Sequence, residues 1–468
     1  MEDKTMTLPV SFVPTPTKEF RLHRKTVKTT LEPGRPTTLT PIPIPKPIPG
    51  PIPGPIPIPF AGSRVLIYKQ DPSVTEIGVR KAYLPGAVLN GPRDAYITSG
   101  TPGLPVISAN VFGDFIEPPN TDSFDAVHTF SIVRMVLTMY QRALQPTAVR
   151  WEWNGNGNGD PINVFPHAGV TMNAYYSRND KALKFFYFTK PGDPPGSPLI
   201  YTCRSLDIVA HETGHAVLDG LKPLWIGAAG NPPQTGGLHE SFGDLTSIFL
   251  ALSQLDQVEA IIAQTKARLH DKTFLSDLAE QFGLALGRPN GLRNADNDLK
   301  LSEVGTEVHA LSQVFTGAVY DILADIFAFE RNPAARDDAI VLYEAGRYLM
   351  SLVLRALLAA PAQAATYADV ANAMLTIAAR DGRPVQYRNF IRNRFTVREV
   401  VVSPTPLTED VPEGARLAAN ITDAPDSEQD RRACCGTLQL PEYSGVEQIV
   451  LDEIESLRNL NGRGPKKK

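Results

Sequence analysis

The segment DIVAHETGHAVLDG, residues 207–220, sets the strongest limit on how this chain can fold. Its flanks are apolar, and their spacing predicts a buried helix over about 206–219. Ser205 suits the N-cap position, and Pro223 prevents the helix from continuing. At about 100° per residue, His211 and His215 lie on one helical face. Burying such polar groups costs several kcal/mol unless a partner satisfies them, and a bound cation would do so.

Two imidazoles one helical turn apart can ligate one Zn²⁺ ion. Glu212 is turned about 100° from His211, so it would lie beside such an ion without ligating it. A general base for a metal-bound water must lie there. Because H-E-x-x-H is a short pattern that also occurs by chance, an ordinary helix is the alternative. Gly214, which costs about 1 kcal/mol in a helix interior relative to Ala, predicts a close backbone approach.

A second helix is predicted from Thr235, which can cap it, to Leu255. Glu240 and Asp244 are four residues apart and therefore share one face. The preceding segment contains KP and NPP, which turn the chain, so this helix can fold back beside the first. Glu240 is then the predicted third metal ligand, and Asp244 can accept the free N–H of a ligating histidine. His239, directed about 100° away from Glu240, is a rival ligand.

Taken together, these motifs resemble those of the thermolysin-like zinc metallopeptidases, which are gluzincins. DIVAHETGHAV matches the zinc helix of that family, and GGLHESFGD matches its glutamate helix. GVTMNAYYSRNDKALKFFYF, from Gly169, resembles the edge strand that binds the substrate backbone. TEVHALSQVFTGAVYDIL, from Thr306, resembles the segment with the histidine that stabilises the transition state. The predicted helix over 123–144 is similar to the long helix of the N-terminal lobe, and the resemblance covers about residues 121–385.

This resemblance implies an α+β fold with two lobes. A mixed α/β N-terminal lobe with an edge strand would face a mainly helical C-terminal lobe across the active-site cleft. It also implies one catalytic zinc ion and a set of site residues. The implied zinc ligands are His211, His215 and Glu240; the implied general base is Glu212; the implied partner of His211 is Asp244; the implied oxyanion donor is His309; and the implied substrate-binding residues are Asn173, Ala174 and Arg293.

The sequence departs from this family at several positions. The segment LKPLWIGAAGNPPQTGG contains Trp225 but lacks the tyrosine that assists the oxyanion in the family. Five residues before His309, where the family has an aspartate, stands Val304, and Glu303 or Glu307 is the predicted substitute. The family also uses calcium, and Asp207 matches one ligand position of its double site.

Calcium is nevertheless not favoured as a second cofactor. Ala251 stands where the family has a ligand glutamate, which argues against the double calcium site.

The implied activity is that of a zinc-dependent endopeptidase, in which Glu212 activates a zinc-bound water and peptides or proteins are the substrates. One alternative is a catalytically weak or inactive binding or scaffold protein that keeps the fold and is stabilised by zinc. A second alternative is a zinc aminopeptidase, which would need an acidic anchor for the free amine of its substrate. Nothing in the sequence marks such an anchor.

Four regions are predicted along the chain: an N-terminal tail with a linker (1–60), the two lobes (61–204 and 205–400) and a C-terminal extension (401–468) that ends in three lysines. Residues 41–59 read PIPIPKPIPGPIPGPIPIP, and alternating proline excludes a helix. This run is predicted to be a polyproline II spacer, and the alternative is a ligand for a partner that binds proline-rich segments.

Composition limits the partners and the compartment. The 46 basic and 50 acidic side chains leave a net charge of -4, which favours neither nucleic acid nor an anionic membrane as partner. Three cysteines, two of them adjacent at 434 and 435, cannot form a disulfide framework. The N-terminus lacks the apolar core of a signal peptide, and no run of about eighteen apolar residues predicts a membrane span. We therefore expect a cytoplasmic protein or one released by a non-standard route.

Overall fold

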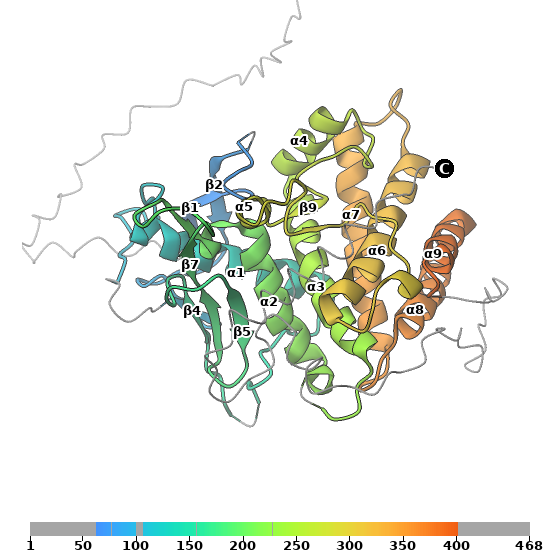
Figure 1. The fold of residues 1–468 in the computed structure, drawn as a ribbon, viewed down its shortest axis with the longest axis horizontal. Coiled ribbons are helices and arrows are strands. Elements are labelled where there is room, and N and C mark those ends of the chain that lie inside the picture. Colours follow the sequence, from blue (N-terminus) through green and yellow to red (C-terminus); the bar gives the residue numbers. More distant parts are fainter. Residues whose placement is uncertain (1–61, 76, 100–105, 156, 227, 401–468) are drawn as a thin grey trace, which may run out of the picture. The chain divides into compact units, whose positions relative to one another are not determined.

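Strands dominate the first part of the chain and helices the rest, in a computed structural model that describes residues 62–400 except 76, 100–105, 156 and 227 (Figure 1). The α+β prediction is therefore confirmed. The predicted tail, proline-rich linker and C-terminal extension, with the adjacent cysteines, lie outside the described residues.

Four strands form the largest sheet among the described residues, in the order β3-β4-β6-β5. The β3-β4 and β4-β6 pairs are parallel, and β5 pairs with β6 antiparallel. Strand β5 thus lies at one end of the order, as the edge-strand prediction requires. The strands of this sheet are β3 (Ile97–Ser99), β4 (Ile162–Phe165), β5 (Ala174–Ser177) and β6 (Ala182–Phe185).

Three two-stranded antiparallel pairs complete the strands that the structure describes. They are β1 with β2 (Ser63–Tyr68, Val79–Leu84), β7 with β8 (Tyr187–Thr189, Leu199–Tyr201) and β9 with β10 (Asp277–Leu278, Arg293–Asn294).

Helix α1 (Asp122–Leu144) begins within one residue of its predicted start. The side chain of Thr121 caps it by accepting a hydrogen bond from the Phe124 N–H. Most of α1 is buried, because it packs against β1, β3 and the next long helix. The apolar residues of α1 therefore contact neighbouring elements on several sides of the helix.

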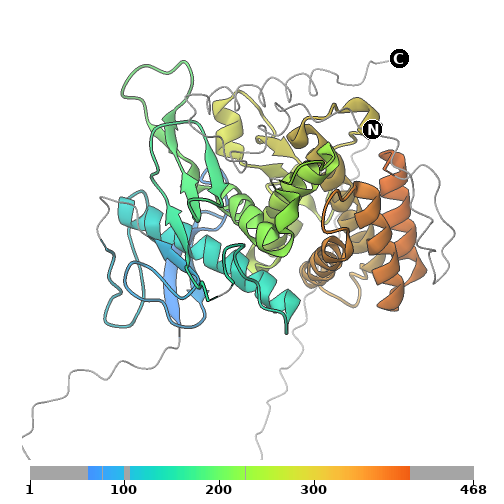
Figure 2. The same cartoon turned by 90° about the horizontal axis from the view of Figure 1, so that it is seen from below.

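The two helices predicted to form the site are α2 (Leu206–Leu221) and α3 (Pro233–Leu252). They pack against each other and α1 packs against α2, as Figure 2 shows for the two green helices and the teal one. Ser205 occupies the N-cap position of α2, although its side chain makes no capping hydrogen bond. The prediction that Thr235 caps α3 is wrong. The helix begins at Pro233, whose fixed φ suits a first turn, and the Thr235 hydroxyl instead donates to the Ala365 carbonyl.

Two glycines on α2 mark close approaches. A Cβ at Gly214 would lie 2.6 Å from the Thr246 Oγ1 and 3.1 Å from the Gly243 Cα on α3, which confirms the predicted backbone approach. Gly220 lies in the last turn of α2. A Cβ there would lie 1.9 Å from the Arg150 carbonyl oxygen, so this glycine is needed for packing.

The remaining helices lie mainly on the other side of α2 and α3 from the four-stranded sheet (Figure 1). Helix α3 packs against α6 and α7, α6 against α9, and α7 against α8. The long helices are α4 (Leu255–Thr265), α6 (Val308–Glu330), α7 (Asp338–Ala359), α8 (Tyr367–Arg380) and α9 (Val385–Val397); the short ones are α5 (Glu280–Ala285), η1 (Thr202–Arg204), η2 (Pro223–Trp225) and η3 (Leu301–Glu303).

Helix α6 is the one described helix whose length and hydropathy would by themselves suit a membrane span. Of its most apolar window, 94% is buried inside the fold. Its contacts with α3, α7 and α9 account for this composition.

One large hydrophobic cluster runs through both halves of the described chain. It includes Val65 and Trp151 from the strand-rich half and Leu245, Phe315 and Phe395 from the helical half. All described residues fall in one compact unit, Pro57–Lys468. The predicted boundary at 204/205 is therefore not a gap in the packing.

Candidate metal centre

Two histidines of α2 and one glutamate of α3 converge in the interior. The Nε2 atoms of His211 and His215 are 2.9 Å apart. The Glu240 Oε2 lies 3.4 Å from the His211 Nε2, and its Oε1 lies 3.4 Å from the His215 Nε2. One ligand atom from each of the three side chains fits within a span of 4.8 Å, and all three side chains are buried. The helical spacing therefore brings together the three residues that the sequence predicts.

The charges at this cluster suit a cation. Burial alone would raise the pKa of Glu240, but the facing His309, His215 and His211 hold it well below its usual value. Burial lowers the pKa of His215 well below its usual value. Two Nε2 lone pairs at 2.9 Å repel each other unless a proton or a cation lies between them. An ionised carboxylate facing two imidazoles is a donor set that fits a divalent metal.

The prediction for Asp244 agrees with its position on α3. Its Oδ1 lies 2.9 Å from the Nδ1 of His211, on the opposite side of the ring from Glu240. Burial opposes the protonated form of His211, but Asp244 and Glu240 outweigh burial and raise its pKa to about 9. A carboxylate at this nitrogen fixes the tautomer that leaves Nε2 free to bind a metal.

Arg293, which the resemblance assigns to substrate binding, forms an ion pair with Asp244. Its Nε lies 3.0 Å from both carboxylate oxygens, and its Nη2 lies 2.8 Å from Oδ1. The guanidinium also borders the cavity next to His211. The structure thus places Arg293 beside the cluster, with a carboxylate as its nearest partner.

His239 does not join the group of ligand atoms. Its Nδ1 lies 2.7 Å from the Nδ1 of His215, on the side of that ring away from Glu240, and the two rings meet edge to edge with their planes 21° apart. Burial lowers its pKa to about 3, although Glu240 acts in the opposite direction. The rival-ligand interpretation of His239 therefore finds no support in this geometry.

Glu212 lies next to the cluster and outside its ligand group, as predicted. Its Oε2 accepts a hydrogen bond of 2.9 Å from the backbone N–H of Tyr176 on strand β5. Burial raises the pKa of Glu212 to about 8, although His211 opposes the shift. This carboxyl group thus lies between helix α2 and strand β5, with a pKa suited to exchanging protons near neutrality.

His309, near the start of α6, directs its Nε2 to within 3.5 Å of the Glu240 Oε2. Its Nδ1 lies 2.6 Å from the Oε1 of Glu307, which also caps α6 through the N–H groups of His309 and Ala310. Glu303 instead accepts from the Lys300 N–H. Of the two candidates predicted from the sequence, Glu307 is therefore the one that contacts His309.

A cavity opens beside His211 and Glu212. Asn173 and Ala174, at the start of β5, line one side of it. Trp225 is not among the residues that line this cavity. It is buried, and its indole N–H donates to the Pro361 carbonyl at 3.0 Å.

Asp207, the residue that matches a calcium ligand, is buried on α2 and also borders this cavity. Burial, and then the carboxyl of Asp71, raise its pKa well above the usual value. The groups of described residues whose ligand atoms lie within 4.8 Å of one another do not include Asp207. Ala251 supplies no ligand atom. Asp207 and Asp71 both act on the charge of the Glu280 carboxyl, so the expectation that calcium is not bound here stays a prediction.

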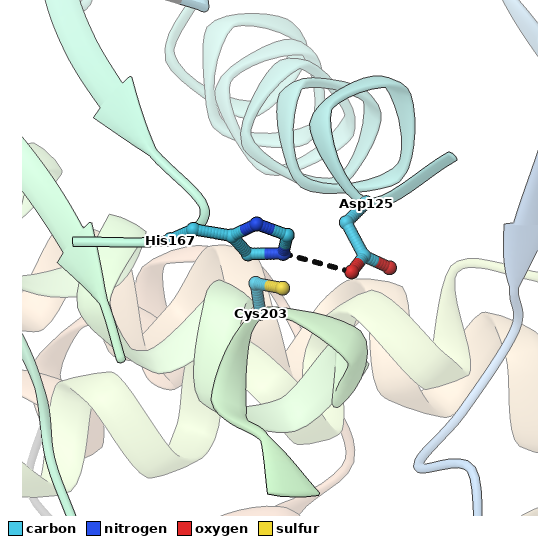
Figure 3. Close-up of side chains that lie close together, drawn as sticks. All are labelled: Asp125, His167 and Cys203. Carbon is cyan, nitrogen blue, oxygen red and sulfur yellow. Dashed lines mark hydrogen bonds and ion pairs between the residues drawn. The ribbon is translucent and has the colours of Figure 1, made fainter. Parts of the chain in front are cut away.

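Two other groups of side chains in the described part of the chain have the spacing of metal ligands. The first is Asp125 on α1 with His167 and Cys203, in which the His167 Nε2 lies 2.9 Å from the Asp125 carboxylate (Figure 3). Arg204 donates to both oxygens of that carboxylate, at 2.7 and 2.8 Å. The arginine already compensates the charge that a cation would require.

The second group is His270, Asp296 and Asp321. Its most buried carboxylate, that of Asp321, is paired with Arg398 at 2.9 Å. Neither of these groups was predicted from the sequence, because their members come from separate segments with no shared spacing.

Comparisons with known proteins do not assign this centre to a family. No protein-family model matches the chain, and no curated protein matches it.

Proposed function

We propose that this chain is a zinc-dependent endopeptidase with the two-lobed arrangement of the thermolysin-like metallopeptidases. One observation carries the proposal. His211, His215 and Glu240 converge from two packed helices, while Glu212 lies beside them and outside the ligand group. A purely structural zinc site is normally closed by four protein ligands, whereas a catalytic one keeps a position open.

The three converging side chains would hold the metal. Two neutral imidazole nitrogens and one carboxylate form a donor set used by catalytic zinc sites. When bound there, zinc would supply a Lewis acid that lowers the pKa of a water to about 7 and polarises the peptide carbonyl.

Glu212 serves as the general base. It accepts the proton of the attacking water and passes it to the leaving amine. The Tyr176 N–H fixes one of its oxygens. Its raised pKa means that it can hold the proton between these two steps.

His309 serves as a hydrogen-bond donor to the carbonyl oxygen as that oxygen gains negative charge. Glu307 binds its Nδ1, so the Nε2 side of the ring faces the metal ligands. Because the chain lacks the family's tyrosine, this donor carries more of the stabilisation.

The substrate is an extended peptide that adds to the edge of the sheet at β5, next to Asn173 and Ala174. The adjoining cavity has walls formed by Ile208, Leu278, Phe282 and Leu292. Such walls favour a bulky aliphatic or aromatic side chain after the scissile bond. The cleft of the proposed two-lobed arrangement runs between this sheet and the helices that follow α3.

Hydrolysis of casein and of N-blocked peptides tests the proposal. Wild type and Glu212→Gln are compared with and without a chelator, after zinc content has been measured. Activity confined to zinc-loaded wild type supports the endopeptidase. Equal, chelator-insensitive rates would reject it, and cleavage of N-blocked peptides would exclude an aminopeptidase.

One observation favours the alternative of a zinc-stabilised binding or scaffold protein. His215, Glu240 and His309 are fully buried. Zinc in stoichiometric amount, a large loss of stability on chelation and no hydrolysis of any peptide would identify that alternative.

A further inference from the structure

The two predicted metal-binding histidines have partners of different charge at their outer nitrogens. At His211 the partner is the carboxylate of Asp244, 2.9 Å away. At His215 it is another imidazole, that of His239, with 2.7 Å between the Nδ1 atoms. His239 is on α3 directly before Glu240, so one turn of that helix provides both a predicted ligand and this contact.

The short Nδ1–Nδ1 distance fixes the proton positions once His215 binds a metal. A histidine that ligates through Nε2 keeps its proton on Nδ1, so the His215 Nδ1–H must be the donor. The Nδ1 of His239 is then the acceptor, and the proton of its neutral ring is on Nε2. That Nε2 is buried and has no hydrogen-bond partner among the described residues.

An unpaired buried N–H group is unfavourable, because it loses its hydrogen bonds to water and gains none in the fold. A histidine at this position is therefore costly to the fold if packing is its only role. Its Nδ1 contact with His215 gives the ring a function that an apolar side chain of similar size could not provide.

We propose that His239 is a positioning residue for the metal, holding His215 in the tautomer and orientation that direct Nε2 towards Glu240. This inference rests on the proposed zinc site. Under this proposal, His211 has an anionic partner, Asp244, and His215 has a neutral partner, His239. A neutral partner donates less charge through the ring than a carboxylate does, so it leaves the metal the stronger Lewis acid.

Zinc affinity tests the proposal without reference to activity. Competition with a chromophoric chelator gives the zinc Kd of wild type, His239→Asn and His239→Leu. We expect His239→Leu to bind zinc about 10–100-fold more weakly, the range found when such partners are removed. His239→Asn should recover most of the loss, because its side-chain oxygen can accept from the His215 Nδ1–H.

The matched control is His128→Leu, which removes an equally buried histidine from α1 and should leave the zinc Kd unchanged. Should His239→Leu fail to fold, wild type alone still gives an answer. In the zinc-loaded, ¹⁵N-labelled protein, the His215 Nδ1–H should show a coupling across the hydrogen bond to the Nδ1 of His239.

The possible results separate the two proposals. Wild type that binds no zinc would overturn the proposed function and this inference together. Wild type that binds zinc, with an equal Kd in His239→Leu or with no coupling between the two rings, would overturn only the role of His239.

Discussion

Two side-chain clusters in this protein each bring three potential metal ligands together, in different charge environments. His211, His215 and Glu240 form one, and Asp125, His167 and Cys203 form the other. Both place three potential metal ligands within a span of 4.8 Å. They differ in the position of the nearest arginine.

In the second cluster the arginine binds the ligand carboxylate directly. Arg204 donates to both oxygens of Asp125, and its guanidinium lies 4.1 Å from the ring centroid of Tyr201. At the proposed metal centre, Arg293 binds Asp244, which is one hydrogen bond removed from His211. Glu240 is left facing histidines. The position of the arginine therefore distinguishes the proposed metal centre from the ion pair at Asp125.

The role of the Asp125 cluster follows from its place in the fold. It joins α1 to η1, the short helix directly before α2. Burial raises the pKa of the Cys203 thiol well above its usual value, so the sulfur stays protonated and is a poor metal ligand. This cluster thus anchors the start of the helix that carries the two predicted zinc ligands.

The largest expected effect is a loss of peptidase activity on substitution near the His211 cluster and not at the Asp125 cluster. Glu212→Gln should lower kcat about 100–10,000-fold, the usual contribution of a general base, and should keep its zinc. Cys203→Ala should stay within about twofold of wild type, because Cys203 neither lines the cavity nor belongs to the His211 group. Steady-state hydrolysis of an N-blocked peptide measures both. Comparable losses in the two variants would contradict the comparison.

The next effect concerns stability. Arg204→Met leaves the buried Asp125 carboxylate with His167 but without its arginine, and should lower the free energy of unfolding by about 3–5 kcal/mol. The control is Arg268→Met, which removes an exposed pair with Asp271 and should cost less than about 1 kcal/mol. Urea denaturation measures both. Equal, small losses would show that the Asp125 pair does not anchor η1.

A smaller effect on stability is expected at the buried carboxyl groups of Glu280, Asp207 and Asp71, where acidic neighbours raise the pKa of Asp207 and of Glu280. Burial, and then Asp207 and Asp71, raise the pKa of Glu280 to about 11. The folded state thus keeps a proton that the unfolded chain loses above about pH 4.3. This stabilisation is complete below that pH and declines as pH rises towards 11.

Glu280→Gln cannot lose that proton. Its free energy of unfolding should match that of wild type near pH 5 and exceed it by about 1–2 kcal/mol at pH 9. This figure is smaller than the full pKa shift implies, because Glu280 is partly exposed to solvent. Thermal unfolding at the two pH values measures the difference. A wild type that gains stability with pH, or that calcium stabilises far more than the variant, would instead assign a bound cation to these acids.

The parts of the fold and site that local sequence determines were predictable. The periodicity of 206–219 and the spacing of Glu240 and Asp244 are properties of single helices, and the prolines between them require a turn. The start of α3 was misplaced, because the Pro232–Pro233 pair begins the helix before Thr235 can cap it.

Contacts between distant segments were not predictable. Arg204 and Asp125 are 79 positions apart, and nothing in their local patterns links them. The choice between Glu303 and Glu307 depends on cap geometry at α6, which a single sequence does not specify. The role of His239 also depends on which ring nitrogen of His215 it contacts, and residue spacing does not show this.

Zinc content per chain, measured by elemental analysis after equilibration with excess zinc and desalting, tests the central claim most directly. The account predicts one zinc in wild type, one in Cys203→Ala and none in Glu240→Ala. Zinc that survives in Glu240→Ala and disappears in Cys203→Ala would place the metal at the Asp125 cluster and contradict the account.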